Sequence, residues 1–169
     1  ELTADSILDL SKNWTVQART FAQSTTGRWS QIKLQMQSAN EKMNWVLPQI
    51  GIMDGRVVVD IHYEDANSTG HNVSSVFGST LANSQAHVRL RNDAATKTLY
   101  AEYDTDGPAN GWTWQGAMNL KWDTGAVKLW NGSQFTDHTV PAWTFTGGGY
   151  VQPALQFGFQ SGSQPIAAG

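Results

Sequence analysis

Asp60, His62 and Glu64 are residues whose types and spacing suit acid–base chemistry. They alternate with apolar residues in the segment "RVVVDIHYE", so in a β-strand they share one face and follow each other at steps of about 7 Å. A glycosidase needs two carboxyl groups, about 5–5.5 Å apart for retention or about 6.5–9.5 Å apart for inversion. The spacing permits such catalysis. Ion pairing across a solvated sheet would explain the same residues without any function.

Two later segments continue this charged pattern. In "HVRLR" and "TLYAEYD", apolar residues alternate with polar ones, and the polar face is predicted to meet solvent. That face carries His87, Arg89, Arg91, Tyr100, Glu102 and Asp104. Because consecutive strands often pair, we expect these residues to join the face of Asp60 in one mixed-charge patch. In an enzyme, the catalytic residues would be Asp60, His62, Glu64, His87 and Tyr100; a binding module would have none.

A second kind of chemistry is suggested by tryptophan and glutamine on faces predicted to be wet. The chain has eight tryptophans. Flat aromatic rings stack on the apolar faces of sugars, and planar amides both donate to and accept from hydroxyl groups. The candidate ligand-binding residues are Trp29, Gln31, Gln35, Trp130, Gln152, Gln156, Arg89 and Arg91. The alternative is that the glutamines merely keep the surface soluble and that loops or a neighbouring domain cover the two tryptophans.

Strand parity sorts the tryptophans between core and surface. From residue 112 to 122 the even positions read Trp, Trp, Gly, Met, Leu, Trp, which predicts three core tryptophans if the run is one unbroken strand. The tryptophans predicted to point inward are Trp14, Trp112, Trp114, Trp122 and Trp143, whereas Trp29 and Trp130 are predicted to be outside and Trp45 is left unassigned. One bulge within the run would expose one of its tryptophans.

Metal-binding signals are weaker. The turns "DTDG", with Asp104 and Asp106, and "EDAN" are rich in oxygen ligands of the kind that Ca²⁺ prefers, but neither has the full spacing of a calcium loop. We therefore expect no cofactor, with a structural Ca²⁺ at Asp104 and Asp106 as the alternative. The four histidines are too dispersed to indicate zinc.

The elements that must position these residues are short β-strands. Alternating runs rich in Thr, Val, Trp, Phe and Tyr predict about ten antiparallel strands, each with one wet face. Half-wet strands exclude a doubly wound α/β sheet, whose strands are buried on both faces. Among the turns, Asn131-Gly132 is expected to form a type I′ hairpin. We predict an all-β, two-sheet antiparallel β-sandwich over residues 1–160, followed by a linker or tail over 161–169.

Composition excludes some partners. Charged residues make up 15% of the chain and the net charge is −3, so there is no basic stripe for nucleic acid and no polybasic patch for a membrane surface. No apolar run is long enough to span a bilayer. The chain has no cysteine, which favours an extracellular or cell-surface protein built without disulfides. The polar tail suggests a module of a longer, multidomain chain.

Two segments, "AHVRLRNDAATKTLYAEYDTDG" and the later "LQFGFQSGS", resemble the concanavalin A-like jelly-roll group, which includes legume lectin-like and laminin-G-like modules. The resemblance implies a jelly-roll sandwich that binds or cleaves glycans on one concave sheet face. The group's retaining glucanases carry a Glu-x-Asp-x-x-Glu strand that "DIHYE" does not match. Its polysaccharide lyases would use Arg, His and Tyr, roles open here to His62 or His87 with Tyr100, but their Gln-x-His signature is missing.

Three functions follow from these residues. The first is a non-catalytic carbohydrate-binding or adhesion module that holds a polysaccharide or other glycan on a sheet face. The second is a polysaccharide lyase or glycoside hydrolase that uses the strand of Asp60, His62 and Glu64. The third is a structural spacer domain without a ligand. We expect the first.

Overall fold

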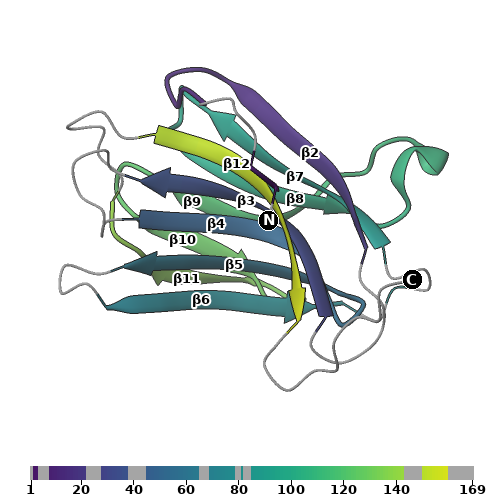
Figure 1. Cartoon of the computed structure of the whole chain (residues 1–169). Coiled ribbons are helices and arrows are strands. Elements are labelled where there is room, and N and C mark those ends of the chain that lie inside the picture. The colour runs from purple at the N-terminus through teal and green to yellow at the C-terminus, as the bar shows by residue number, and fades with distance from the viewer. Residues whose placement is uncertain are drawn as a thin grey trace.

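The computed structural model is a sandwich of two antiparallel sheets, with six strands in each (Figure 1). It describes residues 2–3, 8–21, 28–37, 45–64, 69–78, 81, 85–142 and 150–159. In sheet order, the first sheet (sheet A) contains β1 (Leu2–Thr3), β12 (Tyr150–Phe159), β3 (Arg28–Gln37), β4 (Trp45–Met53), β5 (Arg56–Glu64) and β6 (Gly70–Phe77). The second (sheet B) contains β11 (Phe135–Thr139), β10 (Ala126–Trp130), β9 (Gln115–Lys121), β8 (Thr98–Asp104), β7 (Gln85–Asp93) and β2 (Trp14–Phe21).

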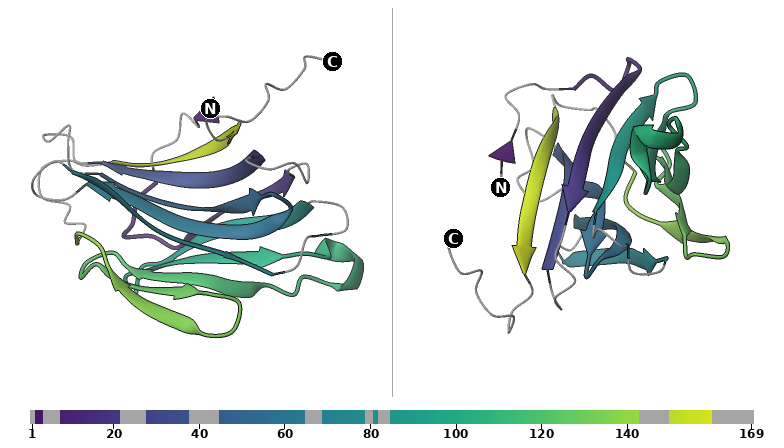
Figure 2. Two further views of the ribbon diagram at one scale, coloured as in Figure 1. Left: turned by 90° about the horizontal axis from the view of Figure 1, so that it is seen from below. Right: turned by 90° about the vertical axis from the view of Figure 1, so that its right-hand side faces the viewer.

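The two sheets form stacked layers (Figure 2). The chain passes from one sheet to the other between β1 and β2, between β2 and β3, between β6 and β7, and between β11 and β12. A short 3₁₀ helix, η1 (Gly107–Asn110), lies in the connection from β8 to β9. The predicted all-β, two-sheet antiparallel sandwich is confirmed. No helix among the described residues has the length and apolar character to cross a membrane.

The core lies between the sheets, where the strand parity of the sequence places it. Fully or almost fully buried side chains include Ile32, Leu34, Met36, Val57, Val59, Ile61, Val88, Leu90, Leu99 and Ala101. Each of the larger ones contributes about 1.5–3 kcal/mol by leaving water. The residues that alternate with them therefore form the two outer faces of the sandwich.

The turns agree only partly with expectation. Asp54 and Gly55 both have positive φ, 51° and 74°, and join β4 to β5 as a tight hairpin. The expected type I′ turn at Asn131-Gly132 is wrong: Trp130 pairs with Phe135, so four residues connect β10 to β11, and only Gly132 of the pair has positive φ. The Asn131 side chain explains the difference, because its Oδ1 accepts hydrogen bonds from the backbone N–H groups of Ser133 and Gln134.

A β-bulge in β9 overturns the prediction for two tryptophans. Ala101 pairs with Met118, but Glu102 pairs with Gly116, so Ala117 is an extra residue on β9 and is itself buried. The extra residue reverses which face of the sheet each residue before it in the sequence points to. Trp112 and Trp114 therefore lie outside the core, and 46% of the surface of Trp112 is exposed.

The other tryptophans divide as follows. Trp14 and Trp122 are half-buried and pack against the core, in agreement with the prediction. Trp130 was expected on a wet face, but it also packs against the core and its ring lies 5.3 Å from the ring of Phe135. It occupies the end of β10, where its partner in the register across the turn is Phe135. Trp143 and the tail over 161–169 lie outside the described residues.

Candidate functional site

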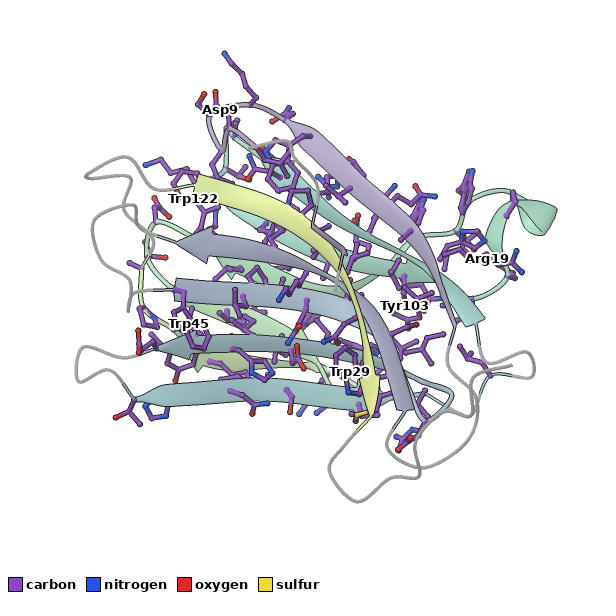
Figure 3. The ribbon with its side chains drawn as sticks, in the orientation of Figure 1. Asp9, Arg19, Trp29, Trp45, Tyr103 and Trp122 are labelled. Carbon is purple, nitrogen blue, oxygen red and sulfur yellow. The ribbon has the colours of Figure 1, made fainter. Side chains whose placement is uncertain are left out.

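The outer face of sheet A is hollowed into a pocket of about 350 Å³. Every lining residue lies on β3, β4, β5 or β6: Trp29, Gln31, Lys33, Leu47, Gln49, Met53, Val58, Asp60, His62, Asn72, Ser74 and Val76. Trp29 stands at one end of the strands and Trp45, which does not line the pocket, at the other (Figure 3). The pocket thus occupies one part of the outer face of sheet A.

Strand register explains why these residues meet. One row across the sheet runs from Lys33 through Gln49 and Asp60 to Ser74, because each residue pairs with the next. The adjacent row contains Gln31, Gly51, Val58 and Val76 in the same way. Leu47, His62 and Asn72 form the third row. Alternation along each strand sends all of them to the face opposite the core.

Two glutamines form part of the polar lining. Gln31 Nε2 donates a hydrogen bond of 2.7 Å to Gln49 Oε1, and both side chains are buried. Gly51 lies opposite Gln31, and a Cβ at that position would collide with the Ser30 carbonyl oxygen and the Gln31 backbone. The two strands approach closely here because Gly51 has no side chain. The amide pair is consequently held in one orientation before any ligand arrives.

Asp60 and His62 supply the titratable groups of the pocket. Asp60 Oδ2 lies 3.5 Å from His62 Nε2. The hydrogen bond to Asp60 raises the pKa of His62, while burial and the nearby charge of Lys33 act in the opposite direction. The second oxygen, Asp60 Oδ1, is buried and has no hydrogen-bond partner among the described residues. A buried carboxylate oxygen without a donor costs free energy, which a ligand hydroxyl group would recover.

Glu64 does not share this pocket. It is buried at the end of β5, is not among the lining residues, and its Oε2 also has no hydrogen-bond partner among the described residues. Asp60 is the one carboxylate in the lining set. The pair of carboxylates predicted for a glycosidase is therefore not brought to a common cavity.

The predicted ligand-binding residues are only partly gathered. Trp29 and Gln31 line the pocket. In the register of β3 with β12, Gln35 pairs with Gln152, and Gln31 pairs with Gln156. The side chains of Gln35, Gln152 and Gln156 lie outside the described part of the chain. Arg89, Arg91 and Trp130 belong to sheet B.

The expected single mixed-charge patch is wrong. Asp60, His62 and Glu64 lie on β5 of sheet A, whereas the other predicted residues lie on β7 and β8 of sheet B, namely His87, Arg89, Arg91, Tyr100, Glu102 and Asp104. The chain changes sheet between β6 and β7, so consecutive strands do not pair at this point. His87 and Tyr100 are thus on a different sheet from the pocket and its His62.

On sheet B the charged and aromatic residues interlock. Glu102 accepts hydrogen bonds from both Arg89 and Arg91. The guanidinium carbon of Arg91 lies 4.2 Å from the centre of the Tyr100 ring. Burial alone would raise the pKa of Glu102, but the two arginines outweigh it and hold that pKa below its usual value. These residues consequently form a network on the outer face of sheet B, held by charge-assisted hydrogen bonds.

Asp104 serves as a backbone anchor. Its Oδ1 accepts hydrogen bonds from the N–H groups of Asp106 and Gly107, and its Oδ2 accepts one from the N–H group of Thr113. Among the described residues, no group of three or more His, Cys, Asp or Glu side chains could hold a metal ion. Backbone amides thus occupy the oxygens expected to bind Ca²⁺, and a calcium site at Asp104 and Asp106 stays a prediction.

Several pocket residues were missed in the sequence. Four polar lining residues are not among the candidates that the sequence suggested: Lys33, Gln49, Asn72 and Ser74. Pro48 and Gly51 interrupt the pattern around Gln49, although the strand itself runs unbroken from Trp45 to Met53. Following strand alternation past Pro48 would have found Gln49. Nothing in the sequence of β6 marks Asn72 or Ser74 as lining residues.

Comparison with known proteins leaves the family open. No protein-family model and no curated protein matches the sequence. Among solved structures, the chain is similar to the crystal structure of a functionally unknown protein from Saccharomyces cerevisiae, with 12% identity, 94% of each chain covered and a TM-score of 0.29. A TM-score this low supports no inference about function. What this chain does must be argued from its own pocket.

Proposed function

We propose that the protein is a non-catalytic carbohydrate-binding module that holds a glycan chain in the pocket of sheet A. The observation that supports this most directly is the lining itself. It combines a tryptophan, a hydrogen-bonded pair of buried amides and a buried carboxylate oxygen without a partner among the described residues. Saccharides present apolar ring faces and hydroxyl groups, and this lining offers a partner for each.

Trp29 is the stacking element of the proposal. It is half-buried at the end of β3, where its Cα partner is Met53 of β4. Burial of part of the indole reduces the conformational freedom that binding would otherwise have to remove. A pyranose ring placed against the remaining indole surface would lie beside Gln31, the next residue on the same face of β3. Stacking and hydrogen bonding then act on one sugar unit.

Asp60 favours a ligand that brings a hydrogen-bond donor into the pocket. Its Oδ1 requires a hydrogen-bond donor, and a sugar hydroxyl group is a donor that carries no charge. The positive groups in the lining are Lys33 and, when protonated, His62, and both lie near Asp60. Their charges are thus opposed by Asp60 within the pocket. The pocket is better suited to a neutral glycan than to a strongly anionic one.

Polysaccharide cleavage is the competing function, and the Asp60–His62 contact favours it. A carboxylate beside an imidazole is an arrangement that moves protons in catalysis. Hydrolysis by two carboxylates is disfavoured, because Glu64 does not line the pocket. The competing enzyme is therefore a lyase that uses His62 as its acid or base. Secretion and attachment to a cell surface remain part of the proposal, and the absence of cysteine agrees with them.

A glycan array, read with and without Ca²⁺, tests the proposal. Isothermal titration with a bound glycan then compares the wild type with Trp29→Ala and with Trp45→Ala, which removes an indole from the other end of the same strands. We expect Trp29→Ala to weaken binding about tenfold or more and Trp45→Ala to change it little. Release of unsaturated or reducing ends that is lost in His62→Ala would establish the enzyme instead. No bound glycan under any condition would support the spacer.

A further inference from the structure

The structure assigns a second saccharide-binding platform to Trp112, on the outer side of sheet B. Trp112 and Phe135 are the exposed large hydrophobic side chains among the described residues, with 46% and 40% of their surfaces exposed. Trp112 lies in the connection from η1 to β9. Covering the exposed part of this indole with a ligand would remove apolar surface from water, which favours binding. This platform extends the proposed function to another face but shares no residue with the pocket.

The indole of Trp112 is held by its neighbours on the sheet. It stacks on Trp114, with ring centres 5.3 Å apart and ring planes 10° from parallel. The guanidinium carbon of Arg89 lies 4.1 Å from the centre of the Trp114 ring, and Glu102 fixes Arg89 in turn. The bulge at Ala117 turns Trp114 to this face, so the stack depends on it.

The loop that carries Trp112 is fixed as well. The Asp104 carboxylate accepts hydrogen bonds from backbone N–H groups at both ends of the loop, from Gly107 and from Thr113. A Cβ at Gly107 would lie 2.9 Å from the ring of His87, so the loop packs closely against this ring. His87 in turn meets Trp112 nearly at right angles, with ring centres 5.0 Å apart. The platform is therefore ordered before it binds, which lowers the entropic cost of association.

Charge around the platform indicates a neutral ligand. The cross-strand rows of His87, Arg89 and Arg91, together with the loop, carry three arginines and three carboxylates, so the formal charges of this set cancel when His87 is neutral: Arg19, Arg89, Arg91, Glu102, Asp104 and Asp106. Arg19 lies opposite His87 in the register of β2 with β7, and Figure 3 shows it beside this loop. Nucleic acid would require a surplus of positive charge that is absent from this set. A polyuronate would require the same.

The rim of the platform offers hydroxyl partners. Asp106 and Thr113 are exposed, and Thr113 Oγ1 lies 3.4 Å from Asp106 Oδ1. A carboxylate and a hydroxyl group beside a flat indole together supply acceptors and a donor at the edge of a stacking surface. This combination suits a neutral saccharide ring better than an apolar peptide, because the sugar hydroxyl groups can form hydrogen bonds with the rim and an apolar peptide side chain cannot. We therefore commit to a neutral sugar unit.

Affinity electrophoresis in soluble β-glucan, mannan and xylan tests the assignment, with polygalacturonate as an anionic comparison. The proteins are the wild type, Trp29→Ala, Trp112→Ala, Trp112→Tyr and Phe135→Ala, each checked by its thermal unfolding. We expect Trp112→Ala to lose at least tenfold in affinity for one of the neutral polysaccharides, and Trp112→Tyr to keep part of it. Trp29→Ala should keep the share of binding that Trp112→Ala removes.

The outcomes separate the two faces. If Trp112→Ala binds every polysaccharide as the wild type does, the second platform is overturned, whatever Trp29→Ala shows. If only Trp112→Ala loses binding, the platform stands and the pocket of sheet A fails as a glycan site. Equal losses in Phe135→Ala and Trp112→Ala would mean a diffuse apolar surface and contradict the assignment to Trp112. Binding through Trp112 to polygalacturonate alone would overturn the neutral ligand.

Discussion

Asp60 Oδ2 lies 3.5 Å from His62 Nε2, inside a pocket that also contains Lys33. The contact raises the pKa of His62 above its ordinary value of 6.5, although burial and Lys33 oppose the shift. The protonated imidazole is thus favoured in the folded protein more than in the unfolded chain. This contact contributes stability that is fully present below pH 6.5 and is lost as the pH rises through the pKa of folded His62.

Asp60→Asn should lower the pKa of His62. The substitution keeps the shape of the side chain but removes the charge that favours the imidazolium. A titration of the His62 ring followed by NMR measures the midpoint in both proteins. Asp137→Asn, which alters an exposed carboxylate on sheet B, is the matched control and should leave the His62 midpoint unchanged. An unchanged midpoint in Asp60→Asn would show that the contact does not set the protonation of His62.

Asp104→Ala should destabilise the protein by roughly 3 kcal/mol, because three backbone N–H groups lose the acceptor that holds the loop. Urea unfolding followed by tryptophan fluorescence measures the loss. Asp104→Asn can still accept some of these hydrogen bonds and should cost less. A loss below about 0.5 kcal/mol in Asp104→Ala, the scale of an ordinary surface substitution, would contradict the anchoring role.

The same carboxylate should shape the acid side of the stability curve. Burial would raise the pKa of Asp104, but the N–H groups of Thr113, Gly107 and Asp106 prevail and lower it below 3.8. A lowered pKa contributes stability above the unfolded value and loses it as the pH falls through the folded value. Below pH 3.8 the wild type should therefore lose stability more steeply than Asp104→Asn. Parallel acid unfolding curves of the two proteins would contradict a lowered pKa of Asp104 in the folded state.

Glu102→Gln should cost about 1–3 kcal/mol, because Arg89 and Arg91 lose the carboxylate that both contact on a partly buried face. The comparison is Asp137→Asn, which breaks the exposed pair with Lys128 and should cost less than Glu102→Gln, because solvent screens that pair. Urea unfolding at pH 7 measures both. Equal losses would mean that the Glu102 network is no stronger than a surface ion pair. The pKa of Glu102 is lowered, so the difference between the variant and the wild type should shrink as the pH falls below 4.5.

Strand alternation predicted the fold and much of the pocket face, because alternation is a local property of the chain. In "RWSQIKLQMQ" the alternation puts Ile32, Leu34 and Met36 on one face and Trp29 and Gln31 on the other. In the structure the first three are in the core and the other two line the pocket. Alternation cannot show where a strand gains a residue. The bulge at Ala117 depends on pairing with β8, a contact between segments that no single run of sequence contains.

The division of the charged residues between the two sheets could not be predicted from the sequence, for a related reason. "DIHYE" and "HVRLR" have the same alternating pattern, and their order in the chain suggests that their polar residues lie close together. The chain places them in different sheets, because it leaves sheet A after β6. Pocket residues such as Asn72 and Ser74 become neighbours of Asp60 only through the pairing of β5 with β6. Sheet order is a global result of packing, and local patterns do not encode it.

Gly51→Ala should prevent folding or cost more than about 2 kcal/mol. The added methyl group would overlap the Ser30 carbonyl oxygen and the Gln31 backbone, and both belong to a central strand that cannot move aside without breaking its pairing. Gly70→Ala is the matched control, since a Cβ there meets nothing within 4 Å, although Gly70 also lies in a strand of sheet A. Thermal unfolding compares the two. A Gly51→Ala protein as stable as Gly70→Ala would show that β3 and β4 do not approach as closely as the pocket requires, and the fixed orientation of the Gln31–Gln49 pair would then lose its physical basis.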